Sequence, residues 1–263
     1  MRTLDHRFSP LYFAFTVALG ACAAEPPPPP VPPCPAPPAT TAPGVAAAAA
    51  APAPALPVGP KLTACANGMQ PAPQGLFDDF EDDNSQVSLQ DGRAGYWWVA
   101  RAPHASISVP GNEFRVSDGG AAGSKKAAHF AGKTDVADVW GAALGANFLG
   151  GGFYDASKYA GVSFKLKGAT KGFVRFKVLD IASHPDGGLC GKDCWNAFGK
   201  TLELTGDWQT IELPFAELAQ YEGWGSPRPP SLTTGKAKHL EWAVDQGVDF
   251  DFWVDDVKLL VCK

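Results

Sequence analysis

Residues 249–261 read as one long strand whose apolar side chains change sides part-way along. Up to Val254, every second side chain is Phe or Val, which is the period of a half-buried strand. From Val257 onward the apolar side chains fall on the opposite parity, and Asp255 and Asp256 stand at the change. A change of parity within a strand predicts a β-bulge, a feature that re-aims neighbouring side chains and is common next to sites.

A second acidic, strand-like stretch stands near the other end of the globular part, at residues 75–81 (Gly-Leu-Phe-Asp-Asp-Phe-Glu). We expect the two terminal strands to lie side by side and to hold one cation between their carboxylates. Carboxylates crowded together without a cation would destabilise the fold, which favours this hypothesis. The alternative is that these acids only cap a solvent-exposed turn.

Residues 1–21 predict an export signal rather than a part of the fold. Arg2 and Arg7 precede an apolar run at residues 11–20, which is too short to span a bilayer as a mature helix. The run ends in Leu-Gly-Ala-Cys22, which resembles a bacterial lipobox and implies that Cys22 becomes the lipidated N-terminus. The protein is then exported and lipid-anchored in the cell envelope, with the outer membrane preferred because Ala23 replaces a retention Asp. The alternative is an ordinary secretory signal.

Residues 22–64 are predicted to be a linker, because they are nearly all Pro and Ala and offer little to a core. Extended polyproline II would lift the following domain off the membrane. Without residues 1–21 the chain keeps 20 basic and 26 acidic side chains, a net charge of −6. This acidic excess argues against nucleic acid and anionic lipid headgroups as partners.

Residues 65–263 are predicted to form one all-β domain. Short alternating runs broken by Gly, Asp and Pro, with no strand–helix alternation, predict an antiparallel two-sheet β-sandwich. Only residues 214–220 have a helical pattern, about two turns long. The strand-like runs between the two terminal ones are residues 96–101, 106–109, 114–116, 127–130, 139–148, 161–167, 173–178, 201–204, 208–213 and 239–244.

The six cysteines suit an oxidising compartment. Cys190 and Cys194 flank three polar residues, and a disulfide between them would shape that loop. Cys65 and Cys262 stand at the two ends of the domain, so they can bridge if the terminal strands are neighbours. Cys34 is left over, and Cys65 has the alternatives of pairing with Cys34 or staying reduced.

Seven blocks of this sequence form a recognisable set, namely residues 77–82, 91–98, 139–145, 154–164, 208–215, 218–225 and 252–257. In this order they resemble carbohydrate-binding module family 11 and the related CIA30-type domains, which have a galactose-binding-like β-jelly roll. The resemblance implies a jelly roll, a structural Ca²⁺ between the first and last strands, and a concave face that binds glycan. By that resemblance Glu81 and Asp255 are the preferred calcium ligands, with Asp79 and Asp256 as second candidates.

Glycan recognition needs flat aromatic faces and a few polar groups. Trp97 and Trp98 point to opposite sides of one strand, so at most one can face a ligand, while Trp208 and Trp242 have the pattern of core residues. For each candidate taken singly, support of the core or of a turn is an equal alternative. The candidates lie among Gly or polar residues, or on outward strand positions: Trp140, Arg175, Asp193, Trp195, Asn196, Gln220 and Trp224.

The sequence contains no catalytic signature that we recognise. Its histidines have no zinc-ligand spacing, and residues 77–82 do not match the paired carboxylates of jelly-roll glycosidases. We therefore expect a monomeric, non-catalytic module that binds a polysaccharide or oligosaccharide. The alternatives are a CIA30-type protein-interaction or envelope-assembly module and a jelly-roll glycanase or lyase.

Overall fold

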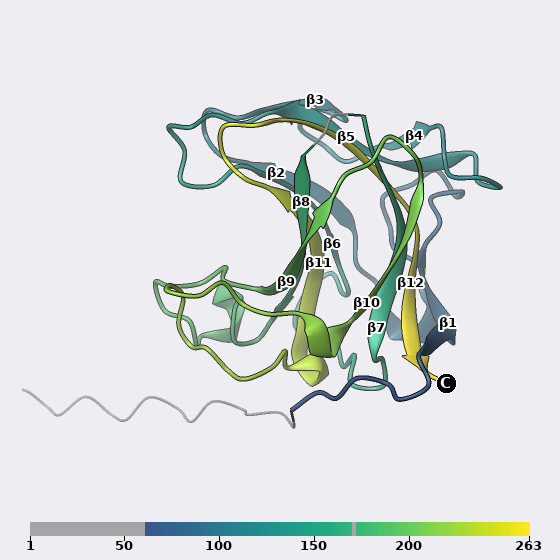
Figure 1. Cartoon of the computed structure of the whole chain (residues 1–263), viewed down its shortest axis with the longest axis vertical. Coiled ribbons are helices and arrows are strands. Elements are labelled where there is room, and N and C mark those ends of the chain that lie inside the picture. The colour runs from purple at the N-terminus through teal and green to yellow at the C-terminus, as the bar shows by residue number, and fades with distance from the viewer. Residues whose placement is uncertain (1–60, 170–171) are drawn as a thin grey trace, which may run out of the picture. The chain divides into compact units, whose positions relative to one another are not determined.

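The computed structural model describes residues 61–169 and 172–263, and in this part of the chain all twelve strands belong to two antiparallel sheets (Figure 1). The predicted all-β sandwich is therefore confirmed. The signal peptide, Cys22, Cys34 and most of the predicted linker lie outside the described residues. No helix among the described residues has the length and apolarity needed to cross a membrane.

The larger sheet has seven strands, and its central strand pairs with three others. The order is β10 (Gln209–Pro214), β7 (Gly161–Gly168), β12 (Asp249–Cys262), β5 (Lys126–Lys133) and β3 (Ser106–Val109), with β1 (Met69–Asp78) added to β12 and β4 (Val116–Asp118) added to β5.

The smaller sheet has five strands and packs its inner face on the larger one. The order is β2 (Trp97–Arg101), β6 (Ala142–Asn147), β11 (Ala237–Val244), β8 (Phe173–Asp180) and β9 (Phe198–Glu203). Every second side chain of each strand enters the core between the sheets. Trp242 is fully buried there, as its pattern predicted, and stacks on Trp97 with ring centroids 5.7 Å apart. Trp208 is only half-buried and lies under the Lys167 ammonium, 4.9 Å from its ring centroid.

The two terminal strands are neighbours, and the bulge lies where the sequence predicted it. β1 pairs antiparallel with β12, placing Leu76 opposite Lys258. The pairing of β12 with β7 shifts register between Asp255 and Lys258, and Asp256 has a left-handed backbone (φ 51°). Because of this shift, Val254 and Val257 are both fully buried although they differ in parity.

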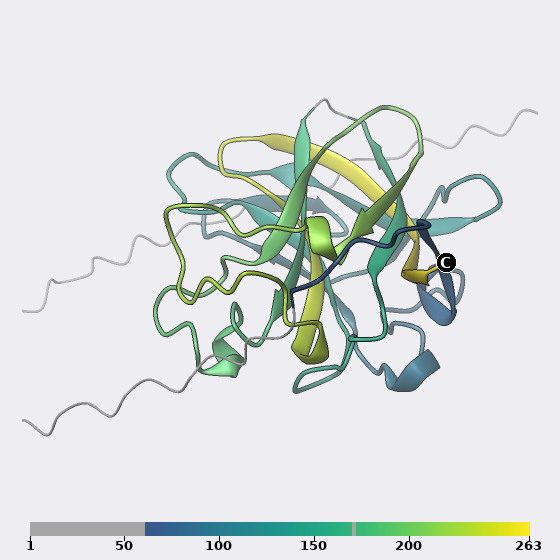
Figure 2. The same cartoon turned by 60° about the horizontal axis from the view of Figure 1, so that its bottom comes forward.

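The predicted helix at residues 214–220 is wrong. β10 runs to Pro214 and is followed by a single 3₁₀ turn, η3 (Phe215–Glu217). The buried pair Phe215 and Leu218 needs only one turn, and Ala219 then exchanges two backbone hydrogen bonds with Gly199 (3.0 and 3.1 Å). Figure 2 shows such short coils in the connections between strands. The others are η1 (Gln90–Gly92), η2 (Pro185–Gly187) and η4 (Thr234–Lys236).

Two disulfides are present among the described residues, and both are the pairs that the sequence favoured. Cys65 bridges to Cys262 across 197 positions and ties the segment before β1 to the end of β12. Cys190 bridges to Cys194 within the connection from β8 to β9.

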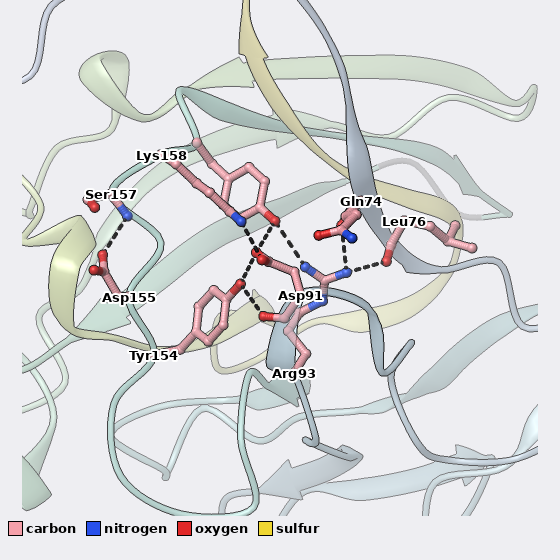
Figure 3. Close-up of polar contacts among 9 residues, drawn as sticks. Gln74, Leu76, Asp91, Arg93, Tyr154, Asp155, Ser157 and Lys158 are labelled. Carbon is pink, nitrogen blue, oxygen red and sulfur yellow. Dashed lines mark hydrogen bonds and ion pairs between the residues drawn. The ribbon is translucent and has the colours of Figure 1, made fainter.

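A buried polar cluster fastens β1 to the connections around η1 and before β7 (Figure 3). The Asp91 carboxylate accepts hydrogen bonds from the hydroxyls of Tyr154 and Tyr159 and pairs with the Lys158 ammonium. The buried Arg93 guanidinium donates to the Tyr159 hydroxyl (3.3 Å) and to two carbonyl oxygens of β1 (3.0 and 2.6 Å). Burial alone would raise the pKa of Asp91, but Lys158 and the two hydroxyls outweigh it and lower that pKa to about 2.

We predict that Asp91→Asn lowers the free energy of unfolding at pH 7 by about 1–3 kcal/mol, because it leaves buried donors without a charged acceptor. Since the folded-state pKa lies below the unfolded value, the carboxylate's contribution is complete above about pH 4 and is lost as the pH falls towards 2. Urea unfolding from pH 7 to pH 2 should therefore show a smaller acid loss in Asp91→Asn than in the wild type. Asp207→Asn, at an exposed site, is the control; equal acid dependence in wild type and Asp91→Asn would contradict the prediction.

We also predict that Cys65→Ser with Cys262→Ser lowers the free energy of unfolding by about 5 kcal/mol, since this bridge closes the longer loop. The matched change of Cys190 and Cys194 to Ser should cost about 2 kcal/mol. Thermal and urea unfolding of both double variants measure the difference. Equal losses would show that loop length does not set the contribution of these bridges.

Candidate functional site

A groove with a volume of about 850 Å³ lies on the outer face of the five-stranded sheet. Strand alternation places Trp242 in the core and its neighbours Glu241 and Ala243 on the groove floor. Figure 1 shows the connections from β8 to β9 and from β11 to β12 on opposite sides of this face. The first of them contributes His184 and Trp195 to the groove, so loops form its walls.

Strand register arranges the floor in two rows that cross the sheet. The first row combines aromatic and charged side chains, and the second is a trough of alanines that ends at an arginine. From β2 to β8, the first row is Trp98, Gly145, Glu241 and Lys177, and the second is Ala100, Ala143, Ala243 and Arg175.

Trp98 forms one end of the first row. Its indole covers Gly145 so closely that a Cβ at that glycine would lie 2.2 Å from the ring. Its Nε1 donates to Asn147 Oδ1 (3.2 Å), which fixes the ring in place. Trp97 points into the core, so the expectation that only one of the two can face a ligand is confirmed, although the sequence did not select Trp98.

An ion pair and a histidine form the middle of the floor. The Lys177 ammonium contacts Glu241 Oε1, and His239 Nε2 donates to Glu241 Oε2 (3.3 Å). Burial would raise the pKa of Glu241, but Lys177 and His239 together lower it to about 2. Glu241 is therefore a fixed anion at every physiological pH.

Four aromatic rings form a row from the groove floor up one wall, and each ring packs edge to face against the next. Ring centroids are 5.1 Å apart between Trp98 and His239, 5.5 Å between His239 and His184, and 5.1 Å between His184 and Trp195. Burial and the neighbouring His239 lower the pKa of His184 to about 4, so this ring is neutral at neutral pH. Its Nδ1 accepts the Asp186 backbone N–H (3.1 Å), which agrees with the neutral form.

The wall that carries Trp195 is held rigidly by its own backbone. Trp195 has a left-handed backbone (φ 78°), which is strained for a bulky residue, and its N–H donates to the Ser183 carbonyl (2.8 Å). The buried Asp180 carboxylate accepts hydrogen bonds from Ser183 and from the Thr233 backbone N–H (2.8 Å). These contacts, with the disulfide at Cys194, set the direction of the Trp195 ring.

Three of the polar residues selected from sequence lie outside the groove lining. Asn196 is buried; its amide donates to the carbonyls of Tyr221 (2.9 Å) and Trp224 (2.6 Å) and accepts the Tyr221 N–H (2.9 Å). Gln220 donates to the Asn196 carbonyl (2.6 Å) and lines a separate, smaller hollow of about 380 Å³. Asp193 is exposed, and its carbonyl accepts the Ser226 N–H (3.3 Å). These three residues support the wall that carries Trp224.

The other four selected residues, Trp140, Arg175, Trp195 and Trp224, all line the groove. Sequence reasoning missed several further lining residues, because each looks like an ordinary outward position until the strands are paired. They are Trp98, Lys177, His184, Tyr221, His239 and Glu241.

The two preferred calcium ligands meet at one loop, residues 119–126. Glu81 Oε1 accepts hydrogen bonds from Ser124 Oγ (2.9 Å) and from the N–H groups of Lys125 (2.7 Å) and Lys126 (2.9 Å). Asp255 Oδ2 accepts the Ala121 N–H (2.8 Å). The backbone donors lower the pKa of Glu81, whereas burial raises that of Asp255.

The second-choice ligands are engaged elsewhere. Asp79 accepts the Glu81 N–H (3.4 Å), and Asp256 pairs with the Lys258 ammonium (3.1 Å). Residues 61–169 and 172–263 contain no cluster of three or more His, Cys, Asp or Glu side chains arranged to hold a metal. Carboxylate oxygens such as those of Glu81 and Asp255 are of the type that calcium prefers, and in this structure they accept hydrogen bonds from Ser124 and from the backbone N–H groups of Ala121, Lys125, Lys126 and Asp256.

No protein-family model matches the sequence, and no curated protein matches it. The fold does match solved structures. One is the family 11 carbohydrate-binding module of the cellulosomal cellulase Lic26A-Cel5E of Clostridium thermocellum, with a TM-score of 0.50, 17% identity, and 75% of this chain and 96% of that chain covered. Another is a family 30 carbohydrate-binding module, with a TM-score of 0.50, 15% identity and coverages of 72% and 87%. The described part of this chain therefore has the β-jelly-roll fold of family 11 and family 30 carbohydrate-binding modules.

Proposed function

We propose that this protein binds a polysaccharide or oligosaccharide in the groove and does not cleave it. The observation that carries the proposal is the gathering of exposed tryptophans. Trp140, Trp195 and Trp224 are 40%, 50% and 48% exposed, and all three line this one groove. Large exposed indoles are costly to solvate, so their convergence indicates a ligand with flat apolar faces.

The floor supplies the polar half of sugar recognition. Lys177, Glu241 and His239 hold one another in fixed positions, so they can meet hydroxyl groups without first being ordered. Trp98 is likewise held through Asn147. Flat rings with a few fixed donors and acceptors are the chemistry that a sugar requires.

The charges of the groove favour binding over hydrolysis. A glycosidase needs a carboxyl group that keeps its proton, opposite a second carboxylate. Glu241 has a pKa of about 2 and is committed to Lys177, while Asp186 is paired with Lys238 (2.6 Å). Of the three acids that line the groove, only Asp245 is therefore left without an ion pair among the described residues, whereas a glycosidase needs two carboxyl groups. The protein-interaction alternative is less favoured, because it predicts a flat, charged face without exposed tryptophans.

The setting of the module is part of the proposal. A lipid on Cys22 and the linker of residues 22–64 would present a monomeric module from the bacterial envelope, preferably from the outer membrane. Calcium held by Glu81 and Asp255 would stabilise the contact between β1, β12 and the loop of residues 119–126. In this proposal the ion is structural and lies outside the groove.

We predict that Trp195→Ala and Trp224→Ala each weaken glycan binding about tenfold or more, since each removes a stacking face from the groove. Affinity electrophoresis against a panel of plant, fungal and bacterial polysaccharides identifies the ligand, and calorimetry then measures the variants. Tyr96→Ala is the control, because Tyr96 is 49% exposed and lies outside the groove lining. Absence of binding to the whole panel, or equal effects of all three variants, would contradict the proposal.

We predict that saturating calcium raises the melting temperature of the wild type by about 5–10 °C over the value in chelator. Glu81→Gln and Asp255→Asn should each reduce this difference, because each removes a charged ligand. Glu113→Gln, an exposed acid elsewhere, should retain it. A wild-type melting temperature that is the same with calcium and with chelator, together with no calcium in elemental analysis, would remove the ion from the proposal.

A further inference from the structure

Arg175 is the one cation of the groove lining that has no carboxylate within ion-pair distance among the described residues. Of the other two, Lys177 is paired with Glu241, and Lys238 is paired with Asp186. Each of these two ion pairs has no net charge. Arg175 leaves a positive charge at the end of the alanine trough.

The groups around Arg175 exclude water from its guanidinium but do not supply hydrogen-bond acceptors for all of its N–H groups. Its guanidinium lies 3.8 Å from the centre of the Tyr221 ring, and Nη2 donates to the Ala219 carbonyl (2.6 Å). Its Nε is buried and has no hydrogen-bond partner, and it lies so near Gly199 that a Cβ on that glycine would come within 3.1 Å of it. Burial accordingly lowers the pKa of Arg175. A desolvated cation of this kind is strongly stabilised by a bound anion.

Asp245 is the acid of the groove lining that is left without an ion pair among the described residues. It does not neutralise the Arg175 guanidinium. It is exposed and keeps its own hydration, whereas Arg175 is half-buried. Asp245 attracts Arg175 only at a distance and forms no ion pair with its guanidinium.

The trough beside Arg175 has a floor of small side chains within the groove, of which Ala143 is 2% exposed. Ala100, Ala143 and Ala243 lie on three adjacent strands, so the smooth floor is about 10 Å long before it reaches Arg175 on the next strand. A pyranose resting on these methyl groups can direct a ring substituent at the guanidinium.

We propose that the groove selects acidic glycans, and that Arg175 binds the carboxylate of a uronic acid. The proposal rests on the proposed function and names the ligand class of the same groove. A carboxylate is planar and can accept two parallel hydrogen bonds, one from Nη1 and one from the second hydrogen of Nη2, because Nε is buried and the first Nη2 hydrogen goes to Ala219. A single hydroxyl cannot accept in this way.

The test uses ligand pairs that differ only in charge. Polygalacturonate, alginate and glucuronoxylan are each compared with their carboxyl-reduced, neutral forms, with dextran sulfate as a sulfate-bearing arm. Full-length wild type is run with Arg175→Gln, Arg175→Lys and the exposed control Arg115→Gln by affinity electrophoresis and calorimetry. We expect at least one uronic-acid polymer to bind about tenfold more tightly than its reduced form.

The variants decide the role of the arginine. Arg175→Gln should remove the preference for the acidic form, Arg175→Lys should keep only part of it, and Arg115→Gln should keep all of it. Arg175→Lys retains the charge, so its preference for the acidic form can test the inference if Arg175→Gln does not fold.

Equal binding of acidic and reduced forms, or equal losses for both forms in Arg175→Gln, would overturn the inference while leaving glycan binding intact. Arg175-dependent binding of dextran sulfate alone would also overturn it. No binding to any neutral or acidic glycan would instead overturn the proposed function.

Discussion

The architecture depends on β12, which is hydrogen-bonded along both edges. On one edge its residues 249–254 pair with β5 and its residues 257–262 pair with β1, while β7 runs along the other edge. The bulge at Asp255 and Asp256 lies between the part of β12 that pairs with β5 and the part that pairs with β1. The register shift there lets both halves of β12 keep an apolar face in the core. The same junction brings the Asp255 carboxylate to the loop that Glu81 also contacts.

The five-stranded sheet can serve as a binding face because its outer side carries very small residues beside very large ones. Gly145 provides the space in which the Trp98 indole lies flat, and Ala143 leaves a hollow in the next row. Two ion pairs on this face are internal to it, Lys177 with Glu241 and Lys238 with Asp186. A ligand therefore displaces water rather than breaking ion pairs.

Sequence periodicity was sufficient for features that depend on one strand or on the chain ends. The bulge follows from the parity change at Asp255, and the bridge of Cys65 to Cys262 follows from the pairing of terminal strands. Features that depend on cross-strand neighbours were not predictable in this way. Trp98 became a groove residue because Gly145 lies opposite it, a relation that only the register defines.

Loop residues were the hardest to interpret, since polar character alone does not distinguish a ligand contact from a support. Asn196 has the composition of a sugar-binding residue, yet its three hydrogen bonds to the backbone at Tyr221 and Trp224 consume its amide. Similarly, the helical pattern at residues 214–220 reflects the burial of Phe215 and Leu218 in one turn, after which Ala219 pairs with Gly199. In both cases a tertiary hydrogen bond overrides a local preference.

The walls order the backbone that carries their aromatic rings, and this bears on the affinity of the proposed ligand. Trp195 is fixed in a strained backbone by Ser183 and by the neighbouring disulfide, and Trp224 is tied through Asn196. Ordering flexible side chains on binding costs about 0.5–1.5 kcal/mol for each one. Folding has already ordered the backbone that carries these rings, so the proposed stacking of a sugar against them would lose less free energy to ordering. The strain at Trp195 is thus borne by the stability of the fold rather than by the binding step.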